Sequence, residues 1–280
     1  MRGPVDGWAQ DERLPASVRR MRIDEALAQW GDRAVASHHS AAALLGLPVY
    51  GVRRPALTIP RSQGRPRHGA SSGAVERHWA DLRDGQLEER RSLLVTAPLR
   101  TVTDCGRMLP LREAVAVAGA ALRLGLVTAI ELAETAEGLR GPGATTAITA
   151  LGLADARAGS GNESLARVSL LLAGLGPVLP QARLEDDPYA HPVDLLLAWA
   201  RTAVEVESAE HHADWLAVRR DIGHHDVANR LAVTLVRTFP AELWPGDALF
   251  LRKVVDAVCA APGRRCRDIR RRRDLRQGPD

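Results

Sequence analysis

Acidic residues alternate with apolar ones in the segment 203–207, which reads AVEVE. Because successive side chains of a strand point to opposite faces, Glu205 and Glu207 would share one face and the valines the other. Asp194 lies near the start of another apolar run, residues 193–199. If the two strands pair, three carboxylates converge, and like charges about 4 Å apart repel by roughly 1 kcal/mol in water and several-fold more where solvent is excluded. The pattern therefore favours a divalent cation among these side chains.

Two other interpretations of these residues remain open. Glu205 and Glu207 could form a solvated strand face, and Asp194 could be an ordinary carboxylate at a sheet edge. The histidines at 211, 212, 224 and 225 could instead hold a transition metal, since imidazole binds Zn²⁺ and Ni²⁺. They lack the HExxH spacing that places two ligands on one helix face.

Length and composition predict a globular protein with one large domain or two ordinary ones. The chain has 280 residues, of which 45% are hydrophobic, enough for a sizeable core. It contains no run of about 18 uncharged apolar residues, the length that a membrane helix needs. The first 22 residues carry acids and arginines where a signal peptide would be apolar. We therefore expect a cytoplasmic protein without a membrane partner. The chain has three widely spaced cysteines, which predict neither a disulfide framework nor a cysteine-rich zinc site.

The basic character of the chain is concentrated at one end. The net charge is +4, yet residues 264–280 contain eight arginines and three aspartates, so the preceding 263 residues carry about −1. A solvated, disordered tail explains this composition most simply, with weak binding of polyanions as the alternative. Among 38 basic residues only Lys253 is a lysine, so any mechanism at Glu205 is expected to work without one.

Hydrophobic periodicity predicts two domains of mixed α/β (α+β) class. We expect a flexible lead-in at 1–18, a mostly helical α/β region at 19–158, a second domain at 159–260 and the tail at 261–280, with the junction in the flexible segment 158–162. The first region should contain helices near 19–30, 38–45, 99–109, 111–124, 129–137 and 144–158 and strands at 56–59, 74–79 and 92–95. The second should contain helices at 163–173, 213–230 and 246–260 and strands at 182–185, 193–199, 203–207 and 232–237, an α-β-β-β-α-β core.

An ordered series of short motifs runs through the second domain: Glu163-Ser164 with Arg167 one turn later, Asp194 in PVDLLLAW, Glu205 in VEVE, His211-His212, Arg220-Asp221, and a last strand carrying Arg237. Together they resemble the very-short-patch-repair-like endonuclease domain, a branch of the PD-(D/E)xK nuclease superfamily. The resemblance covers residues 155–258 and implies a restriction-endonuclease-like fold.

The same resemblance implies hydrolysis of phosphodiester bonds in DNA with Mg²⁺ or Mn²⁺. Asp194, Glu205 and Glu207 would be the metal ligands, and Glu163 and His212 would complete the catalytic set, His212 as general base. Arg167, Arg220 and Arg237 would contact nucleic acid. The chain departs from its relatives where Glu207-Ser208 replaces Asp-Gly and where histidines 224 and 225 replace an arginine.

The first domain carries a resemblance of its own. Residues 37–50 (SHHSAAALLGLPVY) and 95–109 (VTAPLRTVTDCGRML) look like the middle region of AbiEi-like antitoxins or transcriptional regulators of toxin-antitoxin systems. Ser37, His38 and Arg100 would then be functional, with a helix cap and a surface arginine as the ordinary alternatives. Relatives begin with a winged helix, for which this chain has too few residues ahead of Ser37. A non-catalytic regulator with a degenerate nuclease fold and a cognate toxin as partner is therefore the alternative function.

Overall fold

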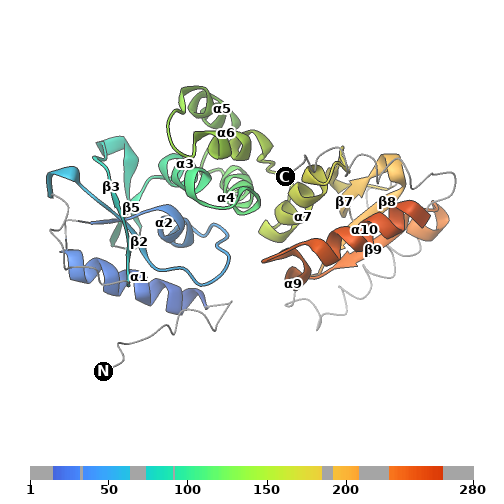
Figure 1. The fold of residues 1–280 in the computed structure, drawn as a ribbon, viewed down its shortest axis with the longest axis horizontal. Coiled ribbons are helices and arrows are strands. Elements are labelled where there is room, and N and C mark those ends of the chain that lie inside the picture. Colours follow the sequence, from blue (N-terminus) through green and yellow to red (C-terminus); the bar gives the residue numbers. More distant parts are fainter. Residues whose placement is uncertain are drawn as a thin grey trace, which may run out of the picture. The chain divides into compact units, whose positions relative to one another are not determined.

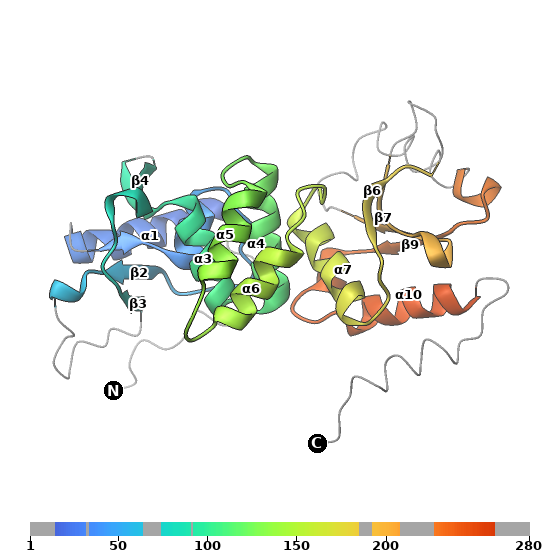
Figure 2. The ribbon, with the colours of Figure 1, turned by 90° about the horizontal axis from the view of Figure 1, so that it is seen from above.

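The structure, a computed structural model, describes residues 15–31, 34–63, 74–90, 92–184, 192–207 and 227–260. The chain forms two compact units, Met1–Asp155 and Ala156–Asp280, and Figures 1 and 2 show their elements. Both units combine helices with a mixed sheet, so the predicted α/β class is confirmed. No helix within the described ranges combines the length and the apolar character that a membrane span requires.

The first unit contains a five-stranded sheet in the order β3-β2-β1-β5-β4. The strands are β1 (Val35–Ala36), β2 (Ala56–Ile59), β3 (Glu76–Trp79), β4 (Leu87–Arg90) and β5 (Leu93–Thr96). β1 pairs in parallel with β5 and antiparallel with β2. The prediction placed β2 correctly and β3 and β5 within two residues, but it missed β1 and β4. β1 has only two residues, and β4 reads LEER, which lacks apolar alternation.

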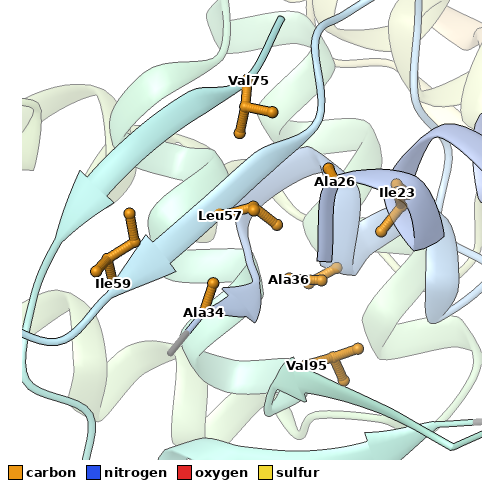
Figure 3. Packing of buried hydrophobic residues seen from close by; sticks show 9 residues of the cluster. Ile23, Ala26, Ala34, Ala36, Leu57, Ile59, Val75 and Val95 are labelled. Atoms are coloured by element: carbon orange, nitrogen blue, oxygen red, sulfur yellow. The ribbon is translucent and has the colours of Figure 1, made fainter. Parts of the chain in front are cut away.

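Helix α1 (Ala16–Trp30) supplies one wall of the core of this sheet. Ile23 and Ala26 are buried on α1 and pack with Leu57 and Ile59 of β2 and with Val95 of β5, as Figure 3 shows. Helix α2 (His38–Leu44) contacts α1, β2 and β5. Burying a Leu or Ile side chain contributes about 1.5–3 kcal/mol, so these contacts fix both helices against the sheet.

Four further helices follow β5 and pack on one another: α3 (Pro98–Met108), α4 (Leu111–Arg123), α5 (Ala129–Gly138) and α6 (Ala144–Leu153). Figure 2 shows them gathered beside the sheet. α3 and α6 approach closely where Gly106 meets Ala147, because a Cβ at Gly106 would lie 3.1 Å from the backbone of α6. All four helices were predicted, although the last ends at Leu153 rather than near residue 158.

The second unit begins with α7 (Gly161–Leu172) and continues with β6 (Leu179–Ala182), β7 (Val193–Leu197) and β8 (Thr202–Val206). These strands pair antiparallel in sequence order, and β9 (Thr234–Thr238) then joins β8 in parallel. Short α9 (Pro240–Leu243) and α10 (Ala248–Ala260) follow. α7 contacts β7, β8 and α10, and α10 contacts β8 and β9.

The strands of the second unit were predicted, with one displaced. β6 begins three residues before the expected strand 182–185 and includes Pro180; proline fits here because β6 is an edge strand of the sheet. Most of the expected helix 213–230 lies outside the described residues.

Cys105 on α3 is a buried free thiol, whereas Cys259 on α10 is disulfide-bonded, which the cysteine count did not predict.

Candidate acidic site

Glu163 enters the site from the first turn of α7. Ser160 caps this helix, since its Oγ accepts a hydrogen bond from the Glu163 backbone N–H at 3.1 Å. The Glu163 side chain is buried and its Oε2 accepts a hydrogen bond from the Gly159 N–H at 2.7 Å. A Cβ at Gly159 would lie 3.1 Å from Glu163 Oε1, so any larger residue here would require the Glu163 carboxylate to shift by a few tenths of an ångström. The loop before α7 therefore holds the carboxylate in place.

Asp194 lies on β7, where buried and half-buried residues alternate along the strand. Leu195 is paired with Val204 of β8, and the same antiparallel register continued by one residue places Asp194 opposite Glu205. Side chains directly opposite each other on an antiparallel pair share a face. The Asp194 Oδ2 atom accepts a hydrogen bond from the Val206 backbone N–H at 2.7 Å, which ties the carboxylate to β8.

Gln181 of β6 connects the two carboxylates, a role that the sequence analysis missed. Its Nε2 donates to Glu163 Oε2 at 2.8 Å and lies 3.3 Å from Asp194 Oδ1. The backbone of Gln181 has φ +50°, in the left-handed region that residues with a Cβ rarely adopt. Such conformations cost on the order of 1 kcal/mol and cluster at functional sites. The sequence feature that could have indicated this role is a glutamine in the short strand directly before the strand that carries Asp194.

The electrostatics of the site reflect the closeness of its acidic side chains. Burial raises the pKa of Asp194 from 3.8 to about 7, with further contributions from the negative charges of Glu163 and Glu205. Hydrogen bonds from Val206 and Gln181 act in the opposite direction and lower this pKa, because they stabilise the carboxylate. Three carboxylates on α7, β7 and β8 thus form a region of excess negative charge.

Glu207 has a different environment from Glu205. Glu205 is half-buried and is paired in the parallel register with Arg237 of β9. Glu207 follows β8, where its N–H donates to Thr238 O at 2.9 Å, and its Oε1 lies 3.5 Å from Arg237 Nη1. Arg237 therefore sits beside both acids and offsets part of their charge.

The described residues contain no group of three or more His, Cys, Asp or Glu side chains arranged to hold a metal ion. Mg²⁺ needs fewer protein ligands, because it keeps several waters and commonly binds through one or two carboxylates together with substrate phosphates. A donor set of carboxylate oxygens suits Mg²⁺ or Mn²⁺ rather than Zn²⁺. Asp194 and Glu205 lie on neighbouring strands and share a face, so their carboxylate oxygens could be two such ligands.

The other predicted residues of this unit divide into two groups. His212 and Arg220 lie outside the described residues, as do the other histidines considered as metal ligands. Arg167 lies on α7 but is only 7% exposed, so the structure does not favour its predicted contact with nucleic acid. Lys253 donates to both carboxylate oxygens of Glu242, at 2.6 and 2.7 Å, and its Nζ lies 3.4 Å from the backbone oxygen of Arg237.

The candidate residues of the first unit lie in a buried polar cluster. Ser37 precedes α2 but its side chain makes no capping hydrogen bond; its Oγ lies 2.9 Å from His38 Nδ1 instead. The His38 ring stacks on His78 at 3.7 Å, and burial together with neighbouring positive groups lowers the His38 pKa to about 2. Arg100 is bound to Asp104 at 2.8 Å on the same helix. His38 is therefore neutral at any physiological pH.

No known protein family, curated protein or solved structure matches this chain. The resemblances drawn from its motifs therefore stay predictions. What the protein does has to be argued from the geometry and charge of its own side chains.

Proposed function

We propose that residues 159–260 form a PD-(D/E)xK endonuclease-like domain that hydrolyses phosphodiester bonds of DNA with Mg²⁺ or Mn²⁺. The observation that carries this proposal is that Asp194 lies close to the negative charges of Glu163 and Glu205, each from a different element, with the Gln181 amide between Glu163 and Asp194. The order of α7, three antiparallel strands and a parallel fourth strand is compatible with such a core. DNA as substrate is consistent with the expected cytoplasmic location.

Each side chain has a proposed task. Asp194 and Glu205 would hold the ion from neighbouring strands. Glu163, whose carboxylate is held by Gly159 and Gln181, would act as an outer ligand of the ion. A bound Mg²⁺ polarises a phosphoryl oxygen and lowers the pKa of a coordinated water. Between metal-free and metal-bound states, the Asp194 proton would leave, because a dication favours the ionised carboxylate.

Arg237 supplies the positive charge that a phosphodiester needs near these acids. Its side chain is 35% exposed and its guanidinium lies 3.5 Å from Glu207, so a phosphate could exchange for this weak ion pair at little cost. His212 remains the proposed general base, since a histidine of ordinary pKa can accept a proton near neutral pH. Glu207 would offset part of the positive charge of Arg237 and remains a proposed third metal ligand.

Nicking of supercoiled plasmid by the purified full chain with Mn²⁺ or Mg²⁺ tests the proposal. We expect Asp194→Asn and Glu205→Gln to abolish nicking, because each removes a ligand charge while keeping the size of the side chain. Asp256→Asn makes the same chemical change on the exposed surface of α10 and should leave nicking intact. Equal nicking by all four proteins, or none by the wild type, would overturn the proposal.

A second candidate function is a non-catalytic regulator or antitoxin that uses the nuclease fold as a scaffold and binds a cognate toxin. The Gln181 amide favours it, because hydrogen bonds from this amide already satisfy oxygens of Glu163 and Asp194 without a cation. Calorimetric titration with Mg²⁺ separates the two functions. Binding that Asp194→Asn removes supports the nuclease, whereas no heat of binding in the wild type supports the scaffold.

A further inference from the structure

The side-chain amide of Gln181 lies between the carboxylates of Glu163 and Asp194, two of the proposed ligands of the cation. Its Nε2 donates to Glu163 Oε2 at 2.8 Å and lies 3.3 Å from Asp194 Oδ1. An amide nitrogen carries two N–H donors, so it stabilises two carboxylates as a cation does, but it offers a metal no lone pair. We propose that Gln181 competes with the metal ion for these oxygens and has to turn away before the ion binds. This inference rests on the proposed function.

The amide contacts the same carboxylate oxygens that the cation needs. Asp194 Oδ2 accepts the Val206 backbone N–H at 2.7 Å, whereas Oδ1 faces the Gln181 amide. Glu163 Oε2 accepts two hydrogen bonds, from the Gly159 N–H and from Gln181, and a carboxylate oxygen has two lone-pair sites. A Mg²⁺ ion at about 2.1 Å from either oxygen would meet the positive ends of the amide N–H groups. The amide and the ion therefore exclude each other.

The backbone of β6 directs this side chain into the site and also allows it to leave. The pairs Pro180–Leu195 and Ala182–Val193 place Gln181 opposite Asp194 in the antiparallel register, and residues directly opposite share a face. Gln181 has φ +50°, a conformation that persists where the surrounding structure holds it. β6 is an edge strand and Gln181 is half-buried, so its amide can rotate toward solvent while β7 and β8 stay in place.

Competition of this kind lowers the apparent affinity of the site for the ion. The ion binds only those molecules in which the amide is displaced, so the apparent dissociation constant rises by the inverse of their fraction. A hydrogen bond to a charged group is strong enough to change such an equilibrium by about tenfold or more. Removing the amide should therefore tighten binding of the ion. A Gln181 side chain that ligated the ion through its amide oxygen predicts the opposite, because its removal would weaken binding.

Isothermal titration calorimetry of the full chain with Mg²⁺, at about pH 9 so that Asp194 is ionised with and without the amide, tests the inference. We expect Gln181→Ala to bind Mg²⁺ about tenfold or more tightly than the wild type. Alanine and glutamine both have an unbranched Cβ, so the variant removes the amide and keeps the same backbone strain. Gln181→Met keeps the length of the side chain and serves if the alanine variant unfolds. Gln29→Ala makes the same change on the exposed surface of α1 and should leave the affinity within about twofold.

The outcomes separate this inference from the proposed function. Tighter binding by Gln181→Ala that a second change, Asp194→Asn, removes supports the competition, including the case in which the wild type binds no Mg²⁺. Tighter binding that survives Asp194→Asn overturns the inference. Equal or weaker binding by Gln181→Ala also overturns it, but leaves the metal site of the proposed function standing. No binding by either protein overturns both.

Discussion

Removing the charge of Glu163 should lower the pKa of Asp194. Glu163→Gln is a clean perturbation because both hydrogen bonds to this carboxylate, from Gly159 and Gln181, end on the same oxygen, Oε2. The amide oxygen of a glutamine can take over both of them. The variant therefore removes a negative charge and keeps the contacts that hold the side chain.

The size of the effect follows from the position of the Gln181 nitrogen. Because Glu163 Oε2 lies 2.8 Å and Asp194 Oδ1 3.3 Å from this nitrogen, the two oxygens are no more than about 6 Å apart. Two unit charges at that distance repel by about 3 kcal/mol at an effective dielectric constant of about 20, which corresponds to roughly two pH units. The pKa of Asp194 should fall by up to about two units in Glu163→Gln, and the rise caused by burial, which is the largest cause, and by Glu205 should remain.

Titration of the aspartate side-chain carboxyl ¹³C signals by NMR measures this pKa directly, with Asp194→Asn to assign the signal. Asp256→Asn on α10 is the control for loss of a remote charge. If the pKa of Asp194 is the same in Glu163→Gln as in the wild type, the two carboxylates do not interact as the structure places them.

The same pKa makes the stability of the second unit depend on pH. The folded chain keeps the Asp194 proton up to about pH 7, whereas the unfolded chain loses it near pH 3.8. This group therefore stabilises the fold fully below about pH 3.8, and its contribution is lost as the pH rises to about 7. The difference amounts to roughly 4 kcal/mol in the wild type, and less in Glu163→Gln. Urea unfolding at pH 5 and pH 8 spans about two of these pH units, so the unfolded state should gain roughly 3 kcal/mol relative to the folded state between the two measurements.

Three further changes have defined outcomes. Gln181→Ala should raise the pKa of Asp194 above its wild-type value, because it removes a hydrogen bond that stabilises the carboxylate; the same NMR titration shows it, and a fall would contradict the bridging role. Gly143→Ala should destabilise the first unit by about 2 kcal/mol or more beyond Gly141→Ala, since both have positive φ but only the Gly143 Cβ would meet a backbone oxygen, that of Arg107 at 2.5 Å. Phe250→Ala should cost about 3–5 kcal/mol in urea unfolding because this side chain is fully buried, and a cost below 1 kcal/mol would be inconsistent with its packing.

The sequence predicted the acidic site better than the residues that organise it. Strand alternation and pairing were enough to bring Asp194 and Glu205 to one face, whereas Glu163 was expected there only from the resemblance to the nuclease family. The role of Gln181 was not predicted, because the expected strand began at residue 182 and Gln181 precedes it. Its backbone has a left-handed conformation that the sequence does not indicate. A local pattern does not encode such a conformation, since its cost is offset by contacts from other elements.

Burial of long polar side chains was likewise hard to predict. Arg167 follows Glu163 by one turn, a spacing that puts both on one face of α7, and that face turned out to be covered. In the first unit, His38 was predicted to be functional from a resemblance, and its ring stacks on His78 from a strand 40 residues later in the chain. Contacts between residues so far apart in sequence are set by the sheet order, which the pattern alone does not determine.

The most direct test of the acidic site is a crystal structure of the protein soaked in Mn²⁺ at pH 8, with anomalous diffraction to locate the ion. The proposed function predicts an anomalous peak bound by Asp194 and Glu205, with the Gln181 amide displaced from between the carboxylates. A map that shows the Gln181 hydrogen bonds intact and no peak at these two side chains would contradict it.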